Sequence, residues 1–412
     1  MGLATRFAGD EADVVADPRF RVILLGSVVS PMGASLVSPL LDSLTGVYGV
    51  PSARIGLVMA AFTAPGVIAI PLVGMVSDRV GRKPVLTAGL ALFGAAGLGL
   101  AFTTDFRVAV ALRLVQGVGF TGIAPVLIAA TGDLFTGERE ATAQGLRFTT
   151  VGASLAVFPF LAGLLVAVAW QYPFFLFALG LPAAVIVHRR FEEPAADPDA
   201  EGLDVTRLLA LVRTPRIALV LLGRAVPSFL WFGFLTYNSI VVVRLLDGTP
   251  GVAGALVAVA SVASSVGGSQ VGRLTAAFDT RRAPLLVGTA AAGLGLAAVA
   301  LAPSLLVAGA GSLVVGAGFG VVLTLYRSTV STVAPAALRG SLVSLGESAG
   351  RIGSTVAPVV MGGAVAFATP RYGFAVAVRG TLLAVVVGSI AVGTACVLFA
   401  DRAMSRDAAT GR

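Results

Sequence analysis

The sequence predicts an all-α integral membrane protein with about twelve transmembrane helices arranged in two repeats of six. The chain of 412 residues is 57% hydrophobic and only 12% charged, with a mean hydropathy of +0.94, whereas about a quarter of the residues of a soluble domain are charged. Its apolar stretches reach the length of about 20 residues that a helix needs to cross a bilayer. Small residues and prolines also recur at matching positions in its two halves.

Polar and charged breaks divide the chain into these spans. The first half is expected to cross the membrane at residues 20–41, 54–76, 84–104, 108–132, 141–166 and 171–188, and the second at 216–243, 251–272, 284–302, 304–330, 341–367 and 373–400. The predicted organisation is an N-terminal six-helix bundle (1–188), a cytoplasmic linker (189–215) and a C-terminal six-helix bundle (216–412).

The two halves repeat each other at an offset of about 199 residues without gaps. The matching pairs are Gly49 with Gly248, Pro51 with Pro250, Gly117 with Gly316, Gly119 with Gly318, Phe120 with Phe319, Pro159 with Pro358, and Arg82 with Arg281. Parallel repeats of this kind are found in secondary transporters, whose substrate site lies between the halves. A duplicated channel would also repeat, but no stretch here resembles a selectivity filter.

The distribution of arginines predicts the orientation of the chain in a cell membrane. With both termini in the cytoplasm, the outer segments hold only Arg54, Arg107, Arg244, Arg371 and Arg379, and most other basic residues lie inside. This arrangement follows the positive-inside rule. The net charge of +8 is therefore attributed to topology and contact with anionic lipid, and nucleic-acid binding is not expected.

Several kinds of chemistry are disfavoured by the composition. A single cysteine, Cys396, and a single histidine, His188, leave no intramolecular disulfide and little basis for a zinc site. The sole lysine, Lys83, precedes a proline, so the chain has no Walker motif for ATP. Gly117-x-Gly119-x-x-Gly122 fits a dinucleotide fingerprint but lies in an apolar helix, where close helix packing explains it better. No cofactor and no metal are expected.

A charged turn between two apolar spans, Gly74 to Lys83, reads G-x-x-x-D-R-x-G-R-K. It resembles the cytoplasmic loop between helices 2 and 3 of the major facilitator superfamily of transporters. Arg113 to Gly119 is similar to the R-x-x-Q-G-x-G pattern of helix 4 in that family. Gly152 and Pro159-x-x-x-Gly163 form a loose version of the glycine-proline motif of its drug:proton antiporter branch, with Phe158 in place of a glycine. The resemblance covers nearly the whole chain and implies a twelve-helix carrier that works as a monomer.

The resemblance implies that the loop is a conformational latch. The spacing of Asp78 and Arg82 allows them to pair around a turn at Gly81. In the family, the motif aspartate contacts the start of helix 11 and an acid at the end of helix 4, which here corresponds to Asp133. The alternative is a solvated loop whose charges only set topology. The expected latch residues are Gly74, Asp78, Arg79, Gly81, Arg82, Lys83 and Asp133.

Charged residues within the spans are candidates for ion coupling or substrate binding, because a charge in lipid costs about 3 kcal/mol or more. In the antiporter branch the motif arginine, here Arg113 with Gln116, is implicated in proton coupling; it could instead only hold its helix through carbonyl groups. Glu347 and Arg351, spaced to pair on helix 11, form either a proton-carrying site or a neutral structural pair. Arg147 and Arg327 are expected at a gate or interface, and Arg224 is ambiguous.

Helix 1 and helix 7 supply the remaining candidates. Pro31 and Pro39 are expected to bend helix 1, whose acid, Asp42, lies at its outer end. Either Asp42 reaches the cavity, or coupling uses Glu347, or the carrier is not coupled to protons. An aromatic and amide patch could line the cavity or simply pack against lipid and helices, with Trp231, Tyr237 and Asn238 on helix 7 and Tyr326 on helix 10.

These features favour a secondary active transporter over a membrane-embedded enzyme or a non-transporting sensor on the same fold. Proton-linked export of small amphipathic compounds is the preferred function. The alternative is uptake or exchange of a polar metabolite such as a sugar or organic anion, and the excess of arginines within the spans suits an anionic solute. The expected partners are a small-molecule substrate, a proton or another ion, and membrane lipid.

Overall fold

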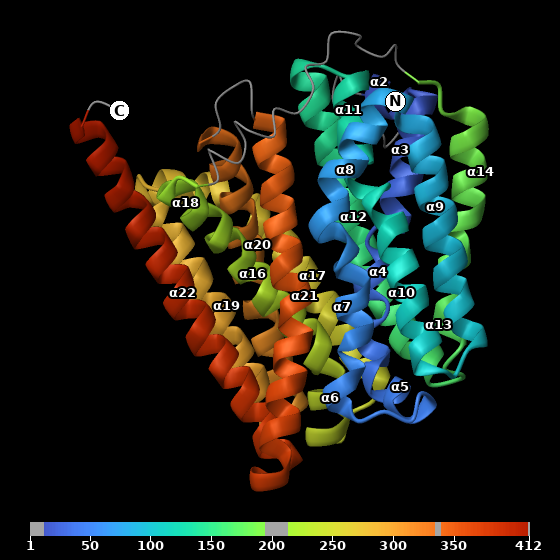
Figure 1. Ribbon diagram of the computed structural model, residues 1–412, viewed down its shortest axis with the longest axis vertical. Coiled ribbons are helices and arrows are strands. Elements are labelled where there is room, and N and C mark those ends of the chain that lie inside the picture. Colours follow the sequence, from blue (N-terminus) through green and yellow to red (C-terminus); the bar gives the residue numbers. More distant parts are fainter. Residues whose placement is uncertain (1–11, 194–212, 334–338, 411–412) are drawn as a thin grey trace.

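The computed structural model describes residues 12–193, 213–333 and 339–410 (Figure 1). These residues contain no β-strand and form twelve helical spans that are long and apolar enough to cross a membrane. The predicted fold class is therefore confirmed. Most of the predicted linker lies outside the described residues, so the boundaries at 188/189 and 215/216 stay a prediction.

The first six spans are built from several short helices as well as long ones. A short helix, α2 (Ala12–Ala16), precedes them. In chain order the spans are α3 (Pro18–Val29) with α4 (Met32–Ser35), η2 (Ser38–Leu40) and α5 (Leu41–Val47); α6 (Ser52–Ile55) with α7 (Leu57–Thr63) and α8 (Pro65–Val80); α9 (Arg82–Gly99) with η3 (Leu100–Phe102); α10 (Phe106–Thr121) with α11 (Ala124–Leu134); α12 (Gly137–Val166); and α13 (Tyr172–Phe175) with η4 (Leu176–Leu179) and α14 (Gly180–Arg190).

The last six spans are mostly single long helices. They are α16 (Pro215–Ile240), extended by the π-helical turn η5 (Val241–Leu245); α17 (Pro250–Ser269); α19 (Arg282–Ala300); α20 (Leu305–Val333); α21 (Arg339–Tyr372); and α22 (Phe374–Thr410). A short amphipathic helix, α18 (Val271–Phe278), connects α17 to α19.

Prolines interrupt the first span as expected. Helix α3 ends just before Pro31, α4 is followed by a 3-10 turn that contains Pro39, and α5 begins only after that turn. A proline ring cannot donate a backbone hydrogen bond and clashes with the preceding turn. The first span is therefore a chain of short helical pieces.

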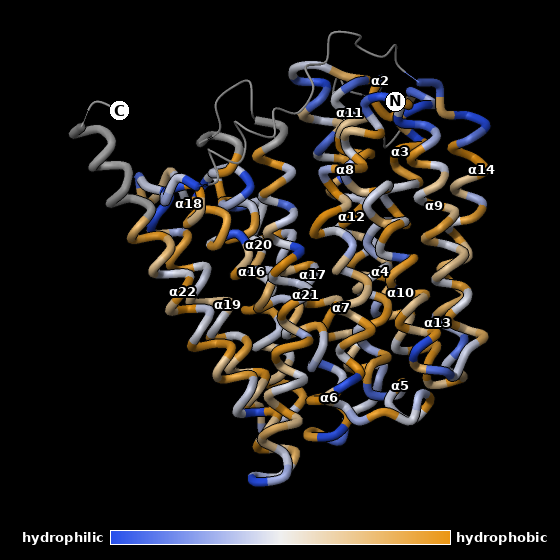
Figure 2. Tube along the Cα trace, viewed as in Figure 1, coloured by the Kyte–Doolittle hydropathy of each residue, from blue (hydrophilic) through white to orange (hydrophobic). Residues whose placement is uncertain are grey.

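Figure 1 shows two groups of helices, α2 to α14 and α16 to α22, which we call the first and second bundles. The end of the molecule where α3 begins and α22 ends is called the terminal side, and the opposite end, with α5 and α6, the far side. On the far side the bundles lie together, and on the terminal side α18 and α22 diverge from α8 and α11. Figure 2 shows hydrophilic residues mainly at these two ends and apolar residues along the spans between them.

Glycines allow α12 and α17 to pack backbone against backbone between the bundles. A Cβ added at Gly163 would lie 2.4 Å from the carbonyl oxygen of Pro250, and one added at Gly254 would lie 2.2 Å from that of Pro159. At Gly152 an added Cβ would lie 3.0 Å from the hydroxyl of Ser265. The glycine-proline motif of α12 thus lies at the contact between the bundles.

Two other glycines, both in α10, allow close helix packing inside the first bundle. A Cβ added at Gly117 in α10 would lie 2.3 Å from the carbonyl oxygen of Phe62. Gly119, on the same helix, approaches the backbone of α9 at Gly89. The glycines of the dinucleotide-like pattern therefore serve close helix packing.

Candidate functional site

A cluster of charged side chains lies between the bundles, centred on Glu347 of α21. Its carboxylate accepts hydrogen bonds from Arg327 of α20, with Nε–Oε1 and Nη2–Oε2 distances of 2.8 and 3.1 Å. Arg224 of α16 donates from Nη2 to the same two oxygens at 3.4 and 3.3 Å. The expected i, i+4 pair of Glu347 with Arg351 is therefore wrong. Two arginines from other helices hold the carboxylate.

Arg351 turns away from Glu347 and reaches toward the first bundle. Its guanidinium lies over the ring of Phe120, 4.5 Å from the centroid. Its aliphatic part passes Gly66 of α8, where an added Cβ would lie 3.0 Å from Cγ of Arg351. The absence of a side chain at Gly66 thus opens room for an arginine that spans the interface.

Arg224 also depends on a glycine. A Cβ at Gly350 would lie 2.6 Å from its Nη1, so the guanidinium rests directly on the backbone of α21. Nη1 donates to the hydroxyl of Ser228 at 2.8 Å, and Nε has no hydrogen-bond partner among the described residues. The sequence left Arg224 ambiguous, because its contact with Gly350 depends on how α16 and α21 pack against each other.

Arg113 is fully buried inside the first bundle and does not reach this cluster. Its Nε donates to the carbonyl oxygen of Val58 at 3.0 Å, and its Nη1 to Oε1 of Gln116 at 2.6 Å. The guanidinium lies over the ring of Phe62 at 4.4 Å, while Gln116 donates to the carbonyl oxygen of Phe93 at 3.3 Å. This geometry ties α10 to α7 and α9 and matches the carbonyl-bound alternative.

Asp42 lies at the far-side seam between the bundles. Its carboxylate forms an ion pair with Arg244 of η5, and Arg244 donates from Nη2 to the hydroxyl of Thr45 at 2.7 Å. The hydroxyl of Ser239 in α16 accepts from the backbone amide of Asp42 at 3.2 Å. The sequence predicts Arg244 in an outer segment, but no pattern in it indicates that Arg244 pairs with Asp42. Together these bonds close the far side.

Substituting Asp42 with asparagine is expected to loosen this seam. Loss of a partly exposed ion pair costs about 1 kcal/mol, which corresponds to about a fivefold shift toward a conformation open on the far side. Double electron–electron resonance between nitroxides at Phe102 and Leu301, both exposed on the far side, will report the shift as longer distances. Asp247→Asn, an exposed change of the same type, is the control. An unchanged distance distribution in the Asp42 variant will contradict this role.

Three of the predicted latch residues, Asp78, Arg82 and Asp133, form a cluster within the first bundle. Arg82 forms an ion pair with Asp78, and its Nε donates to Oδ2 of Asp133 at 2.9 Å and its Nη1 to Ser77 at 3.1 Å. The expected direct contact of Asp78 with Asp133 is wrong, because Arg82 lies between the two acids and pairs with both. The pairing of Asp78 with Arg82 is as expected. Among the described residues Asp78 bonds only to Arg82, and the residues just before α21 (334–338) lie outside them.

The other residues of the loop have distinct surroundings. Gly81 has a φ of +97°, a conformation that favours glycine, and joins α8 to α9. The backbone amide of Lys83 donates to Oε1 of Glu193 at 3.2 Å. Arg79 is exposed, and a Cβ added at Gly74 would meet no atom within 4 Å. Neither Arg79 nor Gly74 therefore packs closely against other described residues in this conformation.

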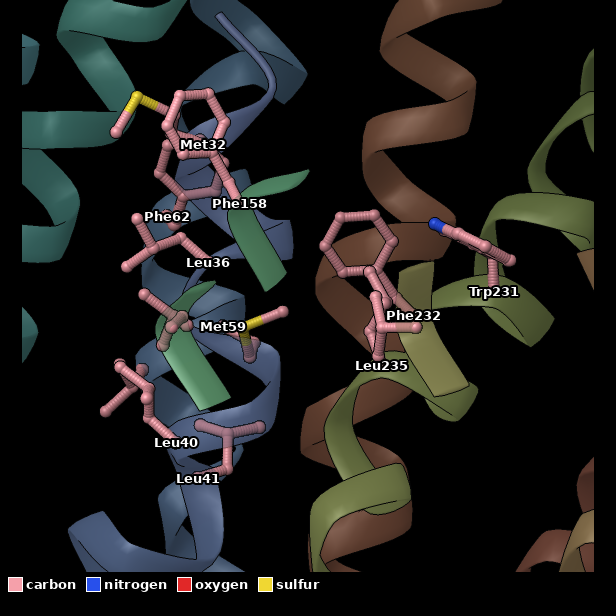
Figure 3. Packing of buried hydrophobic residues seen from close by; sticks show 14 of the residues in the cluster. Met32, Leu36, Leu40, Leu41, Met59, Phe62, Phe158, Trp231, Phe232 and Leu235 are labelled. Atoms are coloured by element: carbon pink, nitrogen blue, oxygen red, sulfur yellow. The ribbon is translucent and has the colours of Figure 1, made fainter. Parts of the chain in front are cut away.

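The aromatic patch of α16 is divided between two environments. Trp231 stacks on Phe319 of α20 with 4.5 Å between ring centroids and an interplanar angle of 7°. Asn238 donates to the carbonyl oxygen of Ala253 at 2.8 Å, and Tyr237 is buried. Phe232 and Leu235 instead point toward the side chains of the first bundle (Figure 3).

Tyr326 does not join this patch, contrary to expectation. It belongs to a separate cluster with Leu285 and Val397. A Cβ added at Gly223 would lie 2.3 Å from its hydroxyl, so Tyr326 packs closely on α16 inside the second bundle. In the described part of the chain, no group of three or more His, Cys, Asp or Glu side chains could hold a metal ion.

Residues 23–358 match the family model described as Major Facilitator Superfamily. The bacillibactin exporter of Bacillus subtilis (strain 168) is 33% identical over 164 residues, which cover 37% of this chain and 40% of the exporter. The uncharacterized MFS-type transporter YceJ of the same organism is 26% identical over 350 residues, covering 83% of this chain and 88% of that protein.

A solved structure has the same fold. A bacterial homologue of the human lysosomal transporter Spinster, in its inward-facing and unoccupied conformation, superimposes with a TM-score of 0.81 at 17% identity, covering 97% of this chain and 98% of that one. The match to the family model spans well over half of the chain. The protein is thus a multi-pass membrane transporter and not an enzyme, and the chain belongs to the Major Facilitator Superfamily.

Proposed function

We propose that this protein is a secondary active transporter that exports small amphipathic organic compounds in exchange for protons. The observation that carries the proposal is the asymmetry of the contact between the bundles. The Asp42–Arg244 seam and the α12–α17 glycines close the far side, while the bundles diverge toward the terminal side. A charged cluster around Glu347 lies between them. Transporters of this architecture move solute by rocking one repeat against the other around such a central site.

We assign the terminal side to the cytoplasm of a cell, with both chain ends inside. The support is the excess of basic residues in the segments that this assignment places inside. Under the assignment, the structure corresponds to the state that receives solute from the cytoplasm. The latch around Arg82 then lies at the cytoplasmic surface, and we propose that it contacts the start of α21 when that side closes. A monomer contains all of these parts.

Export is supported by the similarity to the bacillibactin exporter, which covers part of both chains. Apolar side chains on both faces of the interface support an amphipathic solute (Figure 3). Leu36, Met59 and Phe62 of the first bundle face Phe232 and Leu235 of the second. In this conformation these side chains are buried against one another, and we propose that they line the solute path when the bundles separate, since binding sites are mostly apolar with a few orienting polar groups.

Glu347 is the stronger candidate for the proton-carrying group. Its side chain is 26% exposed, and its two ion-pair partners, Arg224 and Arg327, come from α16 and α20. A movement of either helix relative to α21 therefore changes the positive charge next to Glu347. Asp42 is held at the closed seam by Arg244, on the side away from the proposed cytoplasmic opening. A carboxylate takes up a proton when it loses a cationic neighbour in a poorly hydrated place.

Transport by the purified chain in proteoliposomes tests the proposal. A panel of amphipathic compounds that are cationic, neutral or anionic is loaded, and a pH gradient is imposed in either direction. We expect at least one compound to move against its own gradient, with flux that collapses when a protonophore is added. Movement that is indifferent to the pH gradient, or confined to sugars, will contradict proton-coupled export and leave only the carrier fold.

A further inference from the structure

The charged cluster between the bundles carries more positive than negative charge. It contains four arginines and one acid: Arg147 of α12, Arg224 of α16, Arg327 of α20, and Glu347 and Arg351 of α21. Glu347 bonds to Arg224 and Arg327. Arg327 also lies near enough to Arg147 for the two guanidiniums to repel each other. Three positive charges therefore remain in excess.

Arg147 has no anionic partner among the described residues, although its side chain is only 4% exposed. Its Nε donates to the neutral amide of Gln144 at 3.0 Å, and its guanidinium lies 4.7 Å from the ring centroid of Phe148. Its Nη2 is buried without a hydrogen-bond partner. A buried donor without an acceptor is costly, so such donors in native proteins are normally matched to a partner.

Arg351 and Arg224 also have guanidinium donors without a hydrogen-bond acceptor among the described residues. Arg351 forms no hydrogen bond or ion pair with any described residue and rests on the ring of Phe120. Arg224 is 4% exposed and keeps a buried Nε without a partner. Three arginines from three helices thus have donors available for an acceptor that the described residues do not provide.

The cluster is partly exposed at Arg327 and Glu347, and aromatic side chains border it at Arg351. The side chains of Arg327 and Glu347 are 43% and 26% exposed, so the described residues do not cover them fully. Phe120 lies below Arg351 and packs edge-on against Phe62, with ring centroids 5.3 Å apart. Phe62 belongs to the apolar cluster that faces Phe232. A molecule whose anionic group contacts the arginines would therefore have aromatic side chains next to its apolar part.

We propose that this arginine cluster binds the anionic group, a carboxylate or phosphate, of the transported solute. This inference rests on the proposed transport function and assigns its substrate class: amphipathic anions with an aromatic or aliphatic body. Guanidinium groups bind such oxyanions through paired, charge-assisted hydrogen bonds. A cationic solute would instead meet the excess positive charge and be repelled.

Binding of three probes that share one body tests the assignment. Naphthoate, naphthamide and naphthylmethylammonium are titrated into the full chain in phosphatidylcholine nanodiscs by calorimetry. We expect naphthoate to bind about tenfold more tightly than naphthamide, as charge-assisted hydrogen bonds imply. Equal affinities, or tightest binding of the ammonium compound, will overturn the proposal.

Two variants locate the binding to the cluster. Arg147→Gln and Arg351→Gln are each expected to weaken naphthoate binding about tenfold and to leave naphthamide binding unchanged. Arg273→Gln, an exposed change on α18, is the control. Because each cluster variant removes a charge without an anionic partner, its melting temperature is expected to equal or exceed that of the wild type. Unaltered naphthoate binding in both variants will refute the assignment.

An anionic lipid headgroup offers the same chemistry as a free solute. Repeating the titration in nanodiscs that contain phosphatidylglycerol separates the two sources. Equal naphthoate affinity in both lipids supports a solute site, whereas competition by phosphatidylglycerol assigns the cluster to lipid and overturns the substrate class. If the cluster does not bind naphthoate but the protein still transports a cation in response to the pH gradient, this inference fails and the proposed transport function stands. Naphthoate binding without transport of any compound is a failure of the proposed function.

Discussion

Glu347→Gln is expected to remove the dependence of transport on an imposed pH gradient and to destabilise the protein. Glutamine cannot ionise, and its neutral amide leaves Arg224 and Arg327 without a counter-charge. Arg224 is only 4% exposed, and leaving a buried charge of this kind uncompensated costs about 3 kcal/mol. Flux into proteoliposomes with and without a pH gradient, together with thermal melting, will measure both effects.

Glu138→Gln is the matched control for this experiment. Glu138 is exposed in the first turn of α12 and makes no ion pair with the described residues, so the substitution removes the same charge elsewhere. Gradient-driven flux at the wild-type level in the Glu347 variant would show that this carboxylate is not the coupling group. A lower melting temperature with coupling intact would assign it a structural role alone.

Gly254→Ala is expected to favour the conformation that is open on the far side. The new Cβ would lie 2.2 Å from the carbonyl oxygen of Pro159, so α17 and α12 must separate. Overpacking of this kind costs about 2 kcal/mol, which corresponds to about a thirtyfold shift in population between the two conformations. Nitroxides at Phe102 and Leu301 are then expected to move apart on the far side.

A second pair of labels makes this experiment decisive. His188 and Phe278 are exposed on the terminal side of the first and second bundle, and their separation is expected to shorten as the far side opens. Gly380→Ala is the control, because it adds the same methyl group where no atom lies within 4 Å. If the two pairs change in the same direction, or neither changes, the glycine contact does not set the conformational balance.

The fold was predictable from the sequence because lipid imposes a simple rule on every span. A span needs about 20 apolar residues, so polar breaks mark its ends. The broken first span was also predictable, since Pro31 and Pro39 act on their own helix. The pairing of Asp78 with Arg82 followed from their spacing across a single turn.

Contacts between distant segments were not predictable in this way. Glu347 was paired with Arg351 because helical spacing indicates neighbours on one helix. Its actual partners come from α16 and α20, and which arginine reaches it depends on the tilt and rotation of those helices. The ion pair of Asp42 with Arg244 joins residues that are 202 positions apart. Arg113 was recognised from a motif, but its burial under Phe62 depends on packing.

The segmented first span has a mechanical consequence. Its far-side pieces, η2 and α5, are bound to the second bundle through Ser38, which donates to the carbonyl oxygen of Leu235, and through Asp42. Its terminal-side piece, α3, packs against α12, α14 and α11 in the first bundle. Since the helix is already interrupted between these pieces, the interruptions can act as hinges within the span. During a transport cycle, α3 can therefore move with the first bundle while η2 and α5 move with the second. The hydrogen bonds within each piece stay intact.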